Sequence, residues 1–475
     1  MRATTLAAAC LLLLLACAGS GATRASSIAV SAETNPYNAL AMRLRVHAPG
    51  ATAARAEWRE DGAVRTTPRV PVAPTGEAVL HLLGLRPSAP YEAVVEVERA
   101  QGLERSEPVA FTTGPLPAPV SGLALRVEGA PPEGYVLLNM LGSAPGVLTA
   151  FDGRGVLRWY RIFEGAEPVG EAKQLAGGNL LAYLGATPGW TLVPGAYVEL
   201  APSGEVLRTI RATPPLFTDN HEALITDAGT PEERIHLFGY ERRTVDLAPL
   251  GLGGSGAVVG HAIQRLRPDG TAEFTWNAFD HVALDEFVNP PQAGAPVGAD
   301  YDHPNSLHVD ANGDYLVSFR NLDALFLVDR DSGAVHWRLG GKRSDFEFLD
   351  DPLGGFSGQH DARFLPDGRL LLFDNGTLHT PPTSRAVEYE LDLEARTARR
   401  VWEHRLDRFN EFTGSAVRDA AGTTWIGASM FGLVERVARD GTVLWRAALT
   451  SGGGKPVPFY RAVPFRSLYG AEPAP

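Results

Sequence analysis

The stretch from Gly313 to Trp337 contains the two short patterns that decide the fold. It begins with Gly313-Asp-Tyr-Leu316, a turn glycine that leads into an apolar strand. It ends with Gly333-Ala-Val-His-Trp337, a turn glycine followed by apolar residues and a tryptophan. Both patterns return along the chain from about residue 121 onward, which is typical of proteins that repeat one small structural unit.

The tryptophan pattern occurs six times, and equivalent positions lie 43 to 68 residues apart. The copies are Gly155-Val-Leu-Arg-Trp159, Gly204-Glu-Val-Leu-Arg208, Gly270 to Trp276, Gly333 to Trp337, Ala398 to Trp402 and Gly441-Thr-Val-Leu-Trp445. A turn-rich unit of this size, with about four short strands, is a propeller blade. The six copies therefore predict an all-β chain with a six-bladed β-propeller over residues 121–475. We expect the tryptophans to pack between blades.

The amino-acid composition excludes several classes of protein. Of the 475 residues, 44% are hydrophobic and 21% are charged, so the chain can bury a core and is not mostly disordered. The formal net charge is −12 and no basic run is present, so we expect no nucleic-acid partner. The 51 glycines and 36 prolines fit many turns between short strands and argue against a helical bundle.

Residues 27–114 predict a small β-sandwich ahead of the repeats. Polar and apolar residues alternate in several short runs, as they do in strands with one buried face. Leu85-Arg-Pro87 with Tyr91, and Phe111-Thr-Thr-Gly114 at the end, resemble the corner and the last strand of a fibronectin type III domain. Pro115-Leu-Pro-Ala-Pro119 then predicts a stiff linker. We assign no chemistry to this domain.

Residues 1–17 predict a signal peptide that ends in a lipid-modification motif. The apolar run after Arg2 is shorter than the roughly 20 residues that a membrane helix needs. Leu14-Leu-Ala-Cys17 resembles a bacterial lipobox, which would make Cys17 the lipidated first residue; ordinary cleavage nearby is the alternative. We therefore expect an exported, periplasmic protein that only this lipid anchors to the outer membrane. Cys10 lies inside the signal, so we expect no disulfide, cysteine nucleophile or thiolate metal site in the mature chain.

Three histidines occupy the same place in consecutive blades. His221 stands eight residues before Gly229, His303 ten before Gly313 and His360 eight before Gly368. Gly414 takes this place in the last blade. Equivalent positions of a propeller lie at similar heights around its axis, so we expect the three imidazoles to meet at one mouth of the channel. A lone histidine in such a fold is usually structural, but three at one position favour a functional site.

Polar neighbours extend this predicted site. Asn305 follows His303 in the string Asp302-His-Pro-Asn-Ser306, and Arg320 comes at the end of the next strand. Imidazole, amide and guanidinium donors around one pocket suit an oxyanion with several oxygens. Most other histidines fall inside strands, and we interpret them as structural. Three more, His261, His281 and His379, lie in insertions, and we give them no role beyond lining an entrance.

Taken in order, these motifs resemble those of the bacterial aryl-sulfate sulfotransferases that do not use phosphoadenosine phosphosulfate. The motifs are Asn220-His221, Asp302-His-Pro-Asn-Ser306, Ser318-Phe-Arg320, Gln359-His360 and Phe373-Asp-Asn-Gly376. The resemblance implies that His360 is the nucleophile and becomes a sulfohistidine. It implies that His221, His303 and Arg320 bind the sulfuryl oxygens, that Asn305 assists, and that His221 or His303 exchanges a proton with the phenolic oxygen. The cysteine pair of some periplasmic members is missing.

The resemblance also implies the substrates and the kinetics. A phenolic sulfate ester is the donor and a phenol the acceptor, with no metal and no cofactor, and members of the family can form homodimers. Phenolate leaves readily because its pKa is about 10, and attack by a neutral imidazole gives a covalent intermediate and ping-pong kinetics. Arg320 lowers the pKa of a nearby imidazole and Asp361 raises it, and the sequence leaves this balance open.

Two other interpretations stay open. One is a metal-dependent propeller hydrolase of the lactonase kind with the histidines as ligands, although an arginine in the same pocket argues against a cation. The other is a non-catalytic surface lipoprotein scaffold, because a fold alone does not establish an activity.

Overall fold

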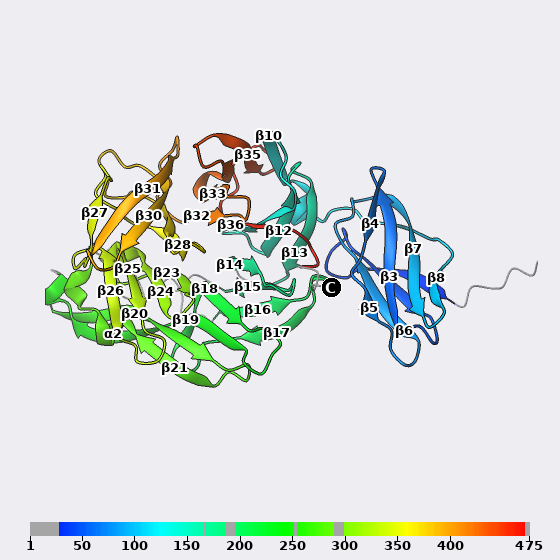
Figure 1. Ribbon diagram of the computed structural model, residues 1–475, viewed down its shortest axis with the longest axis horizontal. Coiled ribbons are helices and arrows are strands. Elements are labelled where there is room, and N and C mark those ends of the chain that lie inside the picture. Colours follow the sequence, from blue (N-terminus) through cyan, green and yellow to red (C-terminus); the bar gives the residue numbers. More distant parts are fainter. Residues whose placement is uncertain (1–27, 166–167, 186–194, 251–253, 289–298, 471–475) are drawn as a thin grey trace, which may run out of the picture.

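The computed structural model describes residues 28–165, 168–185, 195–250, 254–288 and 299–470. These residues form an all-β structure in two parts (Figure 1). The short helices are α1 (Ala118–Ser121) and α2 (Ala278–His281), with the 3-10 helices η1 (Ala248–Leu250), η2 (Leu284–Glu286), η3 (Arg320–Leu322) and η4 (Ser429–Phe431). Within the described ranges, no helix is long and apolar enough to cross a membrane. The expected signal peptide and Cys17 lie outside the described residues.

The N-terminal part consists of two antiparallel sheets around one apolar core. The first sheet contains β1 (Ala29–Thr34), β2 (Met42–His47) and β6 (Glu77–Leu82). The second contains β3 (Ala53–Glu60), β4 (Ala63–Thr66), β5 (Val70–Pro71), β7 (Pro90–Arg99), β8 (Gly102–Arg105) and β9 (Val109–Thr112). Alternation along the strands places Leu44, Trp58 and Val95 in the shared core. At the expected corner, the Tyr91 hydroxyl accepts the backbone N–H of Arg86.

The larger part consists of six sheets. The first contains β11 (Tyr135–Met140), β12 (Gly146–Asp152), β13 (Leu157–Phe163) and β36 (Phe459–Phe465), and the second β14 (Val169–Gln174), β15 (Leu180–Leu184), β16 (Ala196–Leu200) and β17 (Val206–Ile210). The third contains β18 (Phe217–Thr226), β19 (Arg234–Asp246), β20 (Ser255–Leu266) and β21 (Ala272–Asn277), with β22 (Ala299–Asp300) beside β20. The fourth contains β23 (Pro304–Val309), β24 (Tyr315–Phe319), β25 (Ala324–Val328) and β26 (Val335–Gly340). The fifth contains β27 (Glu347–Leu349), β28 (His360–Phe364), β29 (Leu370–Asp374), β30 (Arg385–Asp392) and β31 (Thr397–Arg405), and the sixth β10 (Ala124–Gly129), β32 (Ser415–Arg418), β33 (Thr424–Ala428), β34 (Leu433–Val437) and β35 (Val443–Thr450).

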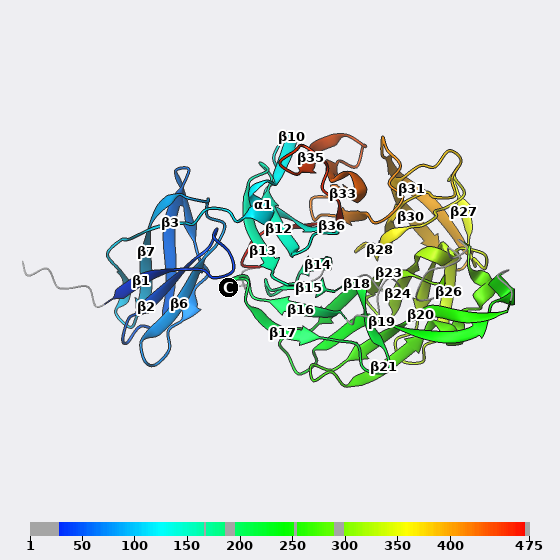
Figure 2. The same ribbon diagram turned by 180° about the vertical axis from the view of Figure 1, so that it is seen from behind.

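One edge strand of each sheet, called its inner strand, contacts the corresponding edge strand of the next sheet. These inner strands are β14, β18, β23, β28, β32 and β36; each contacts the next, and β36 contacts β14. The ends of the larger part are built into neighbouring sheets, since β10 pairs with β35 and β36 pairs with β11. Both views of the ribbon show the sheets arranged around the inner strands (Figures 1 and 2).

Tryptophans of the repeated pattern connect neighbouring sheets. The indole N–H groups of Trp159, Trp276 and Trp445 donate to the carbonyl oxygens of Pro202, Gly333 and Gly153, at 2.8, 3.0 and 2.9 Å. Each acceptor lies in a turn of the following sheet, so these side chains hold adjacent sheets together.

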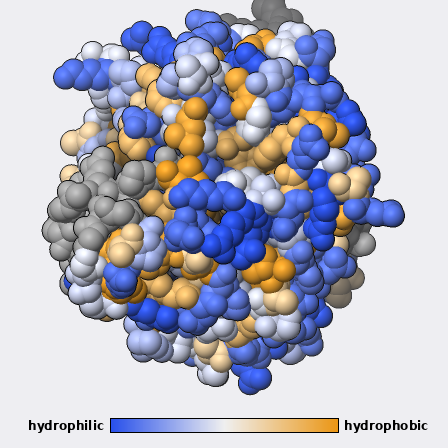
Figure 3. All heavy atoms as spheres, turned by 90° about the vertical axis from the view of Figure 1, so that its left-hand side faces the viewer, coloured by the Kyte–Doolittle hydropathy of each residue, from blue (hydrophilic) through white to orange (hydrophobic). Residues whose placement is uncertain are grey.

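Polar contacts join the two parts of the molecule. Arg158 forms an ion pair with Glu60 at 2.8 Å, and the Tyr469 hydroxyl donates to the carbonyl oxygen of His81 at 2.8 Å. On the face of the larger part that points away from this junction, hydrophilic and hydrophobic side chains are interspersed (Figure 3). The N-terminal part is thus fixed to one side of the larger part, away from the inner strands.

Candidate active site

The residues predicted to carry the chemistry lie on or beside three inner strands. His221 lies within β18, His303 directly precedes β23, and His360 begins β28. Arg320 begins η3, directly after β24. The pairing register shifts between Thr218 and Ala223, between Pro304 and Ser306, and between His360 and Arg363. Such irregularities bend a strand and redirect its side chains, which positions the histidines.

The structure brings these four side chains together. The rings of His221 and His303 meet edge to face, with their centroids 4.6 Å apart. His360 lies close enough to Arg320, His303 and His221 for their charges to lower its pKa. His221 and His360 are buried, whereas 23% of the His303 side chain is exposed.

Hydrogen bonds fix which nitrogen of His360 carries the proton. Its Nδ1 lies 2.7 Å from Oδ1 of Asn375 and 2.9 Å from the carbonyl oxygen of Gly358. The Asn375 amide N–H groups donate to two backbone carbonyls, of Asn410 and Thr413, so its Oδ1 faces the ring. Two acceptors at Nδ1 require a proton there, which leaves the lone pair on Nε2. Among the described residues, Nε2 has no hydrogen-bond partner.

The surroundings keep the His360 ring neutral. Burial is the largest cause that lowers its pKa well below the ordinary value, and the charge of Arg320 is the second. Asp361, whose influence the sequence left open, turns elsewhere: its carboxylate accepts the N–H of Ala416 and lies 3.1 Å from Arg363. A neutral imidazole with a free lone pair on Nε2 is what nucleophilic attack requires.

Carboxylates hold the other two imidazoles. Nδ1 of His221 lies 2.8 Å from Oδ1 of Asp219, and Nδ1 of His303 lies 2.5 Å from Oδ2 of Asp300. Burial lowers the pKa of His221, and the charge of Asp219 opposes that shift. A carboxylate behind an imidazole stabilises the imidazolium, so these two rings are suited to gain and lose a proton at Nε2.

Arg320 keeps donors available for an anionic ligand. One of its N–H groups donates to Oδ1 of Asn321 at 3.0 Å, and its guanidinium lies over the ring of Phe412, 5.3 Å from the centroid. No further side-chain hydrogen bond of Arg320 occurs in the part of the chain that the structure describes. Phe412 is 44% exposed, so an apolar ring and a cation lie side by side at the surface of the site.

Asn305 is buried between inner strands. Its Nδ2 donates to the carbonyl oxygen of Gln359 at 2.6 Å, and its own backbone carbonyl accepts from Tyr460 and Arg461. These contacts position the segment that carries His360. A contact between Asn305 and a substrate stays a prediction.

Sequence reasoning gave no role to several groups that contact the site histidines. Asn375 lies within the Phe373-Asp-Asn-Gly376 motif, and Asp219 directly precedes Asn220-His221, so the sequence held a signal for both. Asp300 reaches His303 only because of the local turn, and no spacing pattern marks it. His261, expected at an entrance at most, is buried between Asp302 and Asp219. The other two insertion histidines make structural contacts, His379 with Asp374 and His281 with Trp276.

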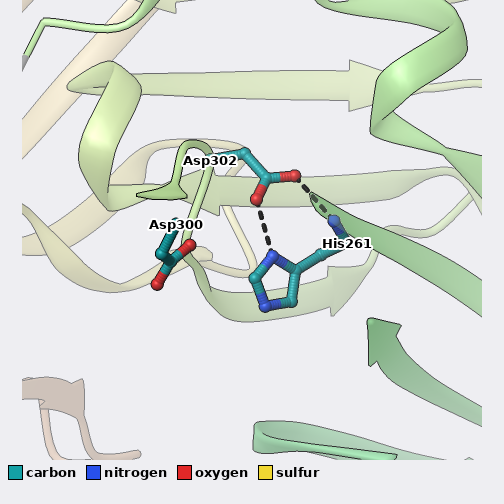
Figure 4. Close-up of side chains that lie close together, drawn as sticks. All are labelled: His261, Asp300 and Asp302. Carbon is teal, nitrogen blue, oxygen red and sulfur yellow. Dashed lines mark hydrogen bonds and ion pairs between the residues drawn. The ribbon is translucent and has the colours of Figure 1, made fainter. Parts of the chain in front are cut away.

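Two groups of described residues have donor atoms within 4.8 Å of one another, close enough to share a metal ion; they are His261, Asp300 and Asp302, and Asp314, Asp329 and His336. In the first group (Figure 4), both oxygens of Asp302 already accept N–H groups of His261, from Nδ1 at 2.6 Å and from the backbone at 3.0 Å. This donor set fits a hydrogen-bonded cluster better than a cation site. The second group lies toward the surface, where its His336 side chain is 39% exposed.

Comparison with known proteins identifies the family. The sequence model of the family described as Arylsulfotransferase (ASST) matches residues 202–450, more than half of the chain, and this segment carries all four side chains of the site. No curated protein sequence matches the chain.

Solved structures show distant similarity. A protein of unknown function from Bacteroides caccae has 13% identity and a TM-score of 0.43, over 71% of this chain and 100% of that one. Virginiamycin B lyase from Staphylococcus aureus has 10% identity and a TM-score of 0.33, over 68% and 88%. A protein from Lactobacillus plantarum has 10% identity and a TM-score of 0.37, over 70% and 97%. The assignment therefore rests on the family match, which shows that the chain belongs to the arylsulfotransferase (ASST) family.

Proposed function

We propose that this protein is an aryl-sulfate sulfotransferase that moves a sulfuryl group from a phenolic sulfate ester to a phenol, without a nucleotide cofactor. The family match supports a sulfotransferase-type function. The observation that carries the proposal is a difference among three adjacent imidazoles: an amide oxygen lies behind His360, and carboxylates lie behind His221 and His303. One place thus offers a neutral nucleophile and two groups that exchange protons.

We further infer that the six sheets form a closed six-bladed β-propeller, preceded by a fibronectin type III-like sandwich. Two observations support closure. The inner strands contact one another in order and return from β36 to β14, and both ends of the larger part pair into neighbouring sheets. A closed ring of sheets leaves no exposed central edge and brings residues that are distant in sequence to one axis.

In the first half-reaction, Nε2 of His360 attacks the donor sulfur in line with the phenolic oxygen. The S–N bond forms while the S–O bond breaks, and the electron pair leaves on the phenolate, which takes a proton from the imidazolium of His221 or His303. Arg320 stabilises the charge on the sulfuryl oxygens, because the charge of a loose transition state lies there and on the leaving oxygen. The exposed ring of Phe412, on the same guanidinium, provides an apolar contact for the aryl group.

The second half-reaction reverses the first with a new phenol. Its oxygen attacks the sulfur of the sulfohistidine, its proton passes to the imidazole that gave one up, and His360 leaves as a neutral ring. Over both half-reactions, the first phenol loses the sulfuryl group and gains a proton, and the second phenol gains the sulfuryl group and loses a proton. The reaction therefore needs no redox partner and no nucleotide.

Trapping the covalent intermediate tests this function. Purified protein is mixed with 4-nitrophenyl sulfate without an acceptor, quenched at once and digested for peptide mapping by mass spectrometry. We expect one added sulfuryl mass on the peptide that contains His360, with release of an equal amount of 4-nitrophenol. Donor consumption without an adduct, abolished by a chelator, would instead identify a metal-dependent hydrolase.

We also propose that the protein is exported and anchored by a lipid on Cys17, a proposal that rests on the Leu14-Leu-Ala-Cys17 motif. The variant Cys17→Ala should move from the membrane to the soluble fraction on expression in a bacterial host. Unchanged fractionation contradicts the anchor and leaves the catalytic proposal intact.

A further inference from the structure

His261 is a buried titratable residue that the proposed mechanism does not use. It lies in β20 and is 3% exposed. Its Nδ1 lies 2.6 Å from Oδ1 of Asp302, and its backbone N–H donates to the other oxygen of that carboxylate at 3.0 Å (Figure 4). Its Nε2 lies 3.5 Å from Oδ2 of Asp219. A carboxylate therefore faces each ring nitrogen.

Both carboxylates continue to the histidines of the candidate site. Oδ1 of Asp219 accepts the ring Nδ1–H and the backbone N–H of His221, at 2.8 and 2.9 Å. Oδ1 of Asp302 accepts the backbone N–H of His303 at 2.9 Å. His303 has a φ of 47°, in the left-handed region that residues other than glycine rarely adopt, so its backbone needs such support. His261 thus connects to His221 through one carboxylate and to His303 through the other.

The charges around His261 favour its protonated form. The side chains of Asp219 and Asp302 have no exposed surface, so each needs a compensating charge. Burial lowers the pKa of His261, but Asp302 and Asp219 outweigh it and raise that pKa well above its ordinary value. The titratable groups that face this ring are Asp219 and His221 of β18, Tyr240 of β19, Asp300 at the end of β22, and Asp302 between β22 and β23. A neutral ring would turn a lone pair toward one of the two carboxylates.

We propose that His261 is a positioning residue: as an imidazolium it ties Asp219 to Asp302, and so aims Nε2 of His221 and holds the backbone at His303. It touches no substrate in this arrangement. The inference rests on the proposed function, because His221 and His303 are its proton-exchanging groups.

Kinetics of His261→Gln provide the first test. The amide keeps a donor toward one carboxylate but loses the positive charge and the bridge. We expect kcat with 4-nitrophenyl sulfate and a phenol to fall roughly 10- to 100-fold, the range known for outer partners of metal-bound histidines, with a smaller change in KM. The pH profile should shift because His221 loses its fixed neighbour. An unchanged kcat and pH profile would overturn the proposal.

The matched control is His336→Gln. His336 also lies beside two carboxylates, at 3.2 Å from Asp314 and 3.7 Å from Asp329, but its side chain is 39% exposed and lies outside the site. We expect this variant to have wild-type kinetics. That result would show that the fall in kcat is specific to the loss of His261.

Nuclear magnetic resonance of the histidine-labelled wild-type protein provides a test that needs no turnover and no altered fold. We expect one imidazole whose two ring nitrogens both remain protonated at pH 8, and its signals should vanish in His261→Gln and persist in His336→Gln. The absence of such an imidazole in the wild-type protein overturns the inference even if His261→Gln does not fold. That result leaves the proposed function standing. Failure to trap an adduct at His360 instead removes the function, and with it the positioning role of His261, even where the doubly protonated imidazole is observed.

Discussion

His221 and Glu222 are neighbours on β18, yet their side chains enter two different polar environments. The first belongs to a histidine layer, which comprises His221, His303, His360 and Arg320. The second belongs to an ion-pair layer, which comprises Glu171, Lys173, Glu222, Asp361, Arg363 and Arg461. On β28, His360 likewise belongs to the histidine layer and the next residue, Asp361, to the ion-pair layer. Both steps fall within the register shifts of these strands, where the irregular backbone redirects the side chains, so one residue is enough to move from one layer to the other.

The two layers differ in the ion-pair and hydrogen-bond partners that their side chains have. In the ion-pair layer, Glu222 lies 2.5 Å from Arg363 and 2.7 Å from Arg461, and it also contacts Lys173. Burial raises the pKa of Glu222, but these three cations outweigh it and lower that pKa. In the histidine layer, the hydrogen bonds of every imidazole to described residues are made at Nδ1 alone. The comparison teaches that a buried carboxylate shared by several cations stabilises the fold, whereas unpaired Nε2 atoms and guanidinium donors are left for a ligand.

Removing His360, the proposed nucleophile, should give the largest effect. We expect His360→Asn to lose roughly 10⁴-fold or more of the sulfuryl transfer rate, as removal of a nucleophile does in other covalent enzymes, while its melting temperature stays near that of the wild type. Turnover with a phenol acceptor and thermal melts measure the two quantities. The exposed variant His336→Asn serves as the control. Retained turnover removes His360 from the mechanism.

Removing a charge from the ion-pair layer should lower the stability of the protein and leave its activity nearly unchanged, which is the reverse of the result expected for His360→Asn. Glu222→Gln keeps the shape of the side chain but leaves three cations without their shared anion. We expect the free energy of unfolding to fall by roughly 3–5 kcal/mol, with little change in kcat per folded molecule. Denaturant unfolding measures the loss, and Glu232→Gln on the exposed surface is the control. A stable but inactive Glu222→Gln variant would show that the two layers are not separate.

Arg320 tests the cationic member of the histidine layer. Since we propose that its N–H groups donate to the sulfuryl oxygens, we expect Arg320→Ala to lower kcat roughly 10²- to 10³-fold at nearly unchanged stability. Steady-state kinetics with 4-nitrophenyl sulfate measure the effect, beside Arg211→Ala as an exposed control. A change of less than about twofold would exclude Arg320 from transition-state stabilisation.

The fold class could be predicted because short patterns that repeat along the sequence determine it. All six copies of the tryptophan pattern fall on one strand of each sheet, namely β13, β17, β21, β26, β31 and β35. The turn glycines of the other pattern, such as Gly313 and Gly368, have φ of 89° and 82°, where a side chain is unfavourable. The all-β class and the family are confirmed, and closure of the ring stays a proposal.

The supporting residues of the site could not be predicted in the same way. The contact of Asp300 with His303 depends on a turn, and that of His261 with Asp219 depends on how β18 and β20 lie on the two sides of β19. Neither follows a spacing in the sequence. Asn375 could be quoted as part of a motif, but its role depends on two loop carbonyls that orient its amide.

Phe412 tests whether the apolar edge of the histidine layer contacts the aryl group. Truncation removes an aromatic contact worth roughly 0.5–1.5 kcal/mol, so we expect Phe412→Ala to raise the KM of the donor by about threefold to tenfold. The variant Leu393→Ala, at a residue that is 56% exposed on another surface, should leave KM unchanged. An equal effect of both variants contradicts a contact at Phe412.

The smallest effect should come from pH, because the pKa of His360 is lowered. An ordinary imidazole is half protonated near pH 6.5 and would lose half of its nucleophilic form there. The lowered pKa of His360 moves this loss to more acidic pH, so Nε2 keeps its lone pair. We therefore expect the single-turnover rate of adduct formation with 4-nitrophenyl sulfate, whose phenolate leaves without a proton, to change less than about twofold between pH 8 and 6.5. Quenched-flow measurement of the adduct checks this, and a rate that falls with a midpoint at or above pH 6.5 contradicts a neutral His360 held between Asn375 and Arg320.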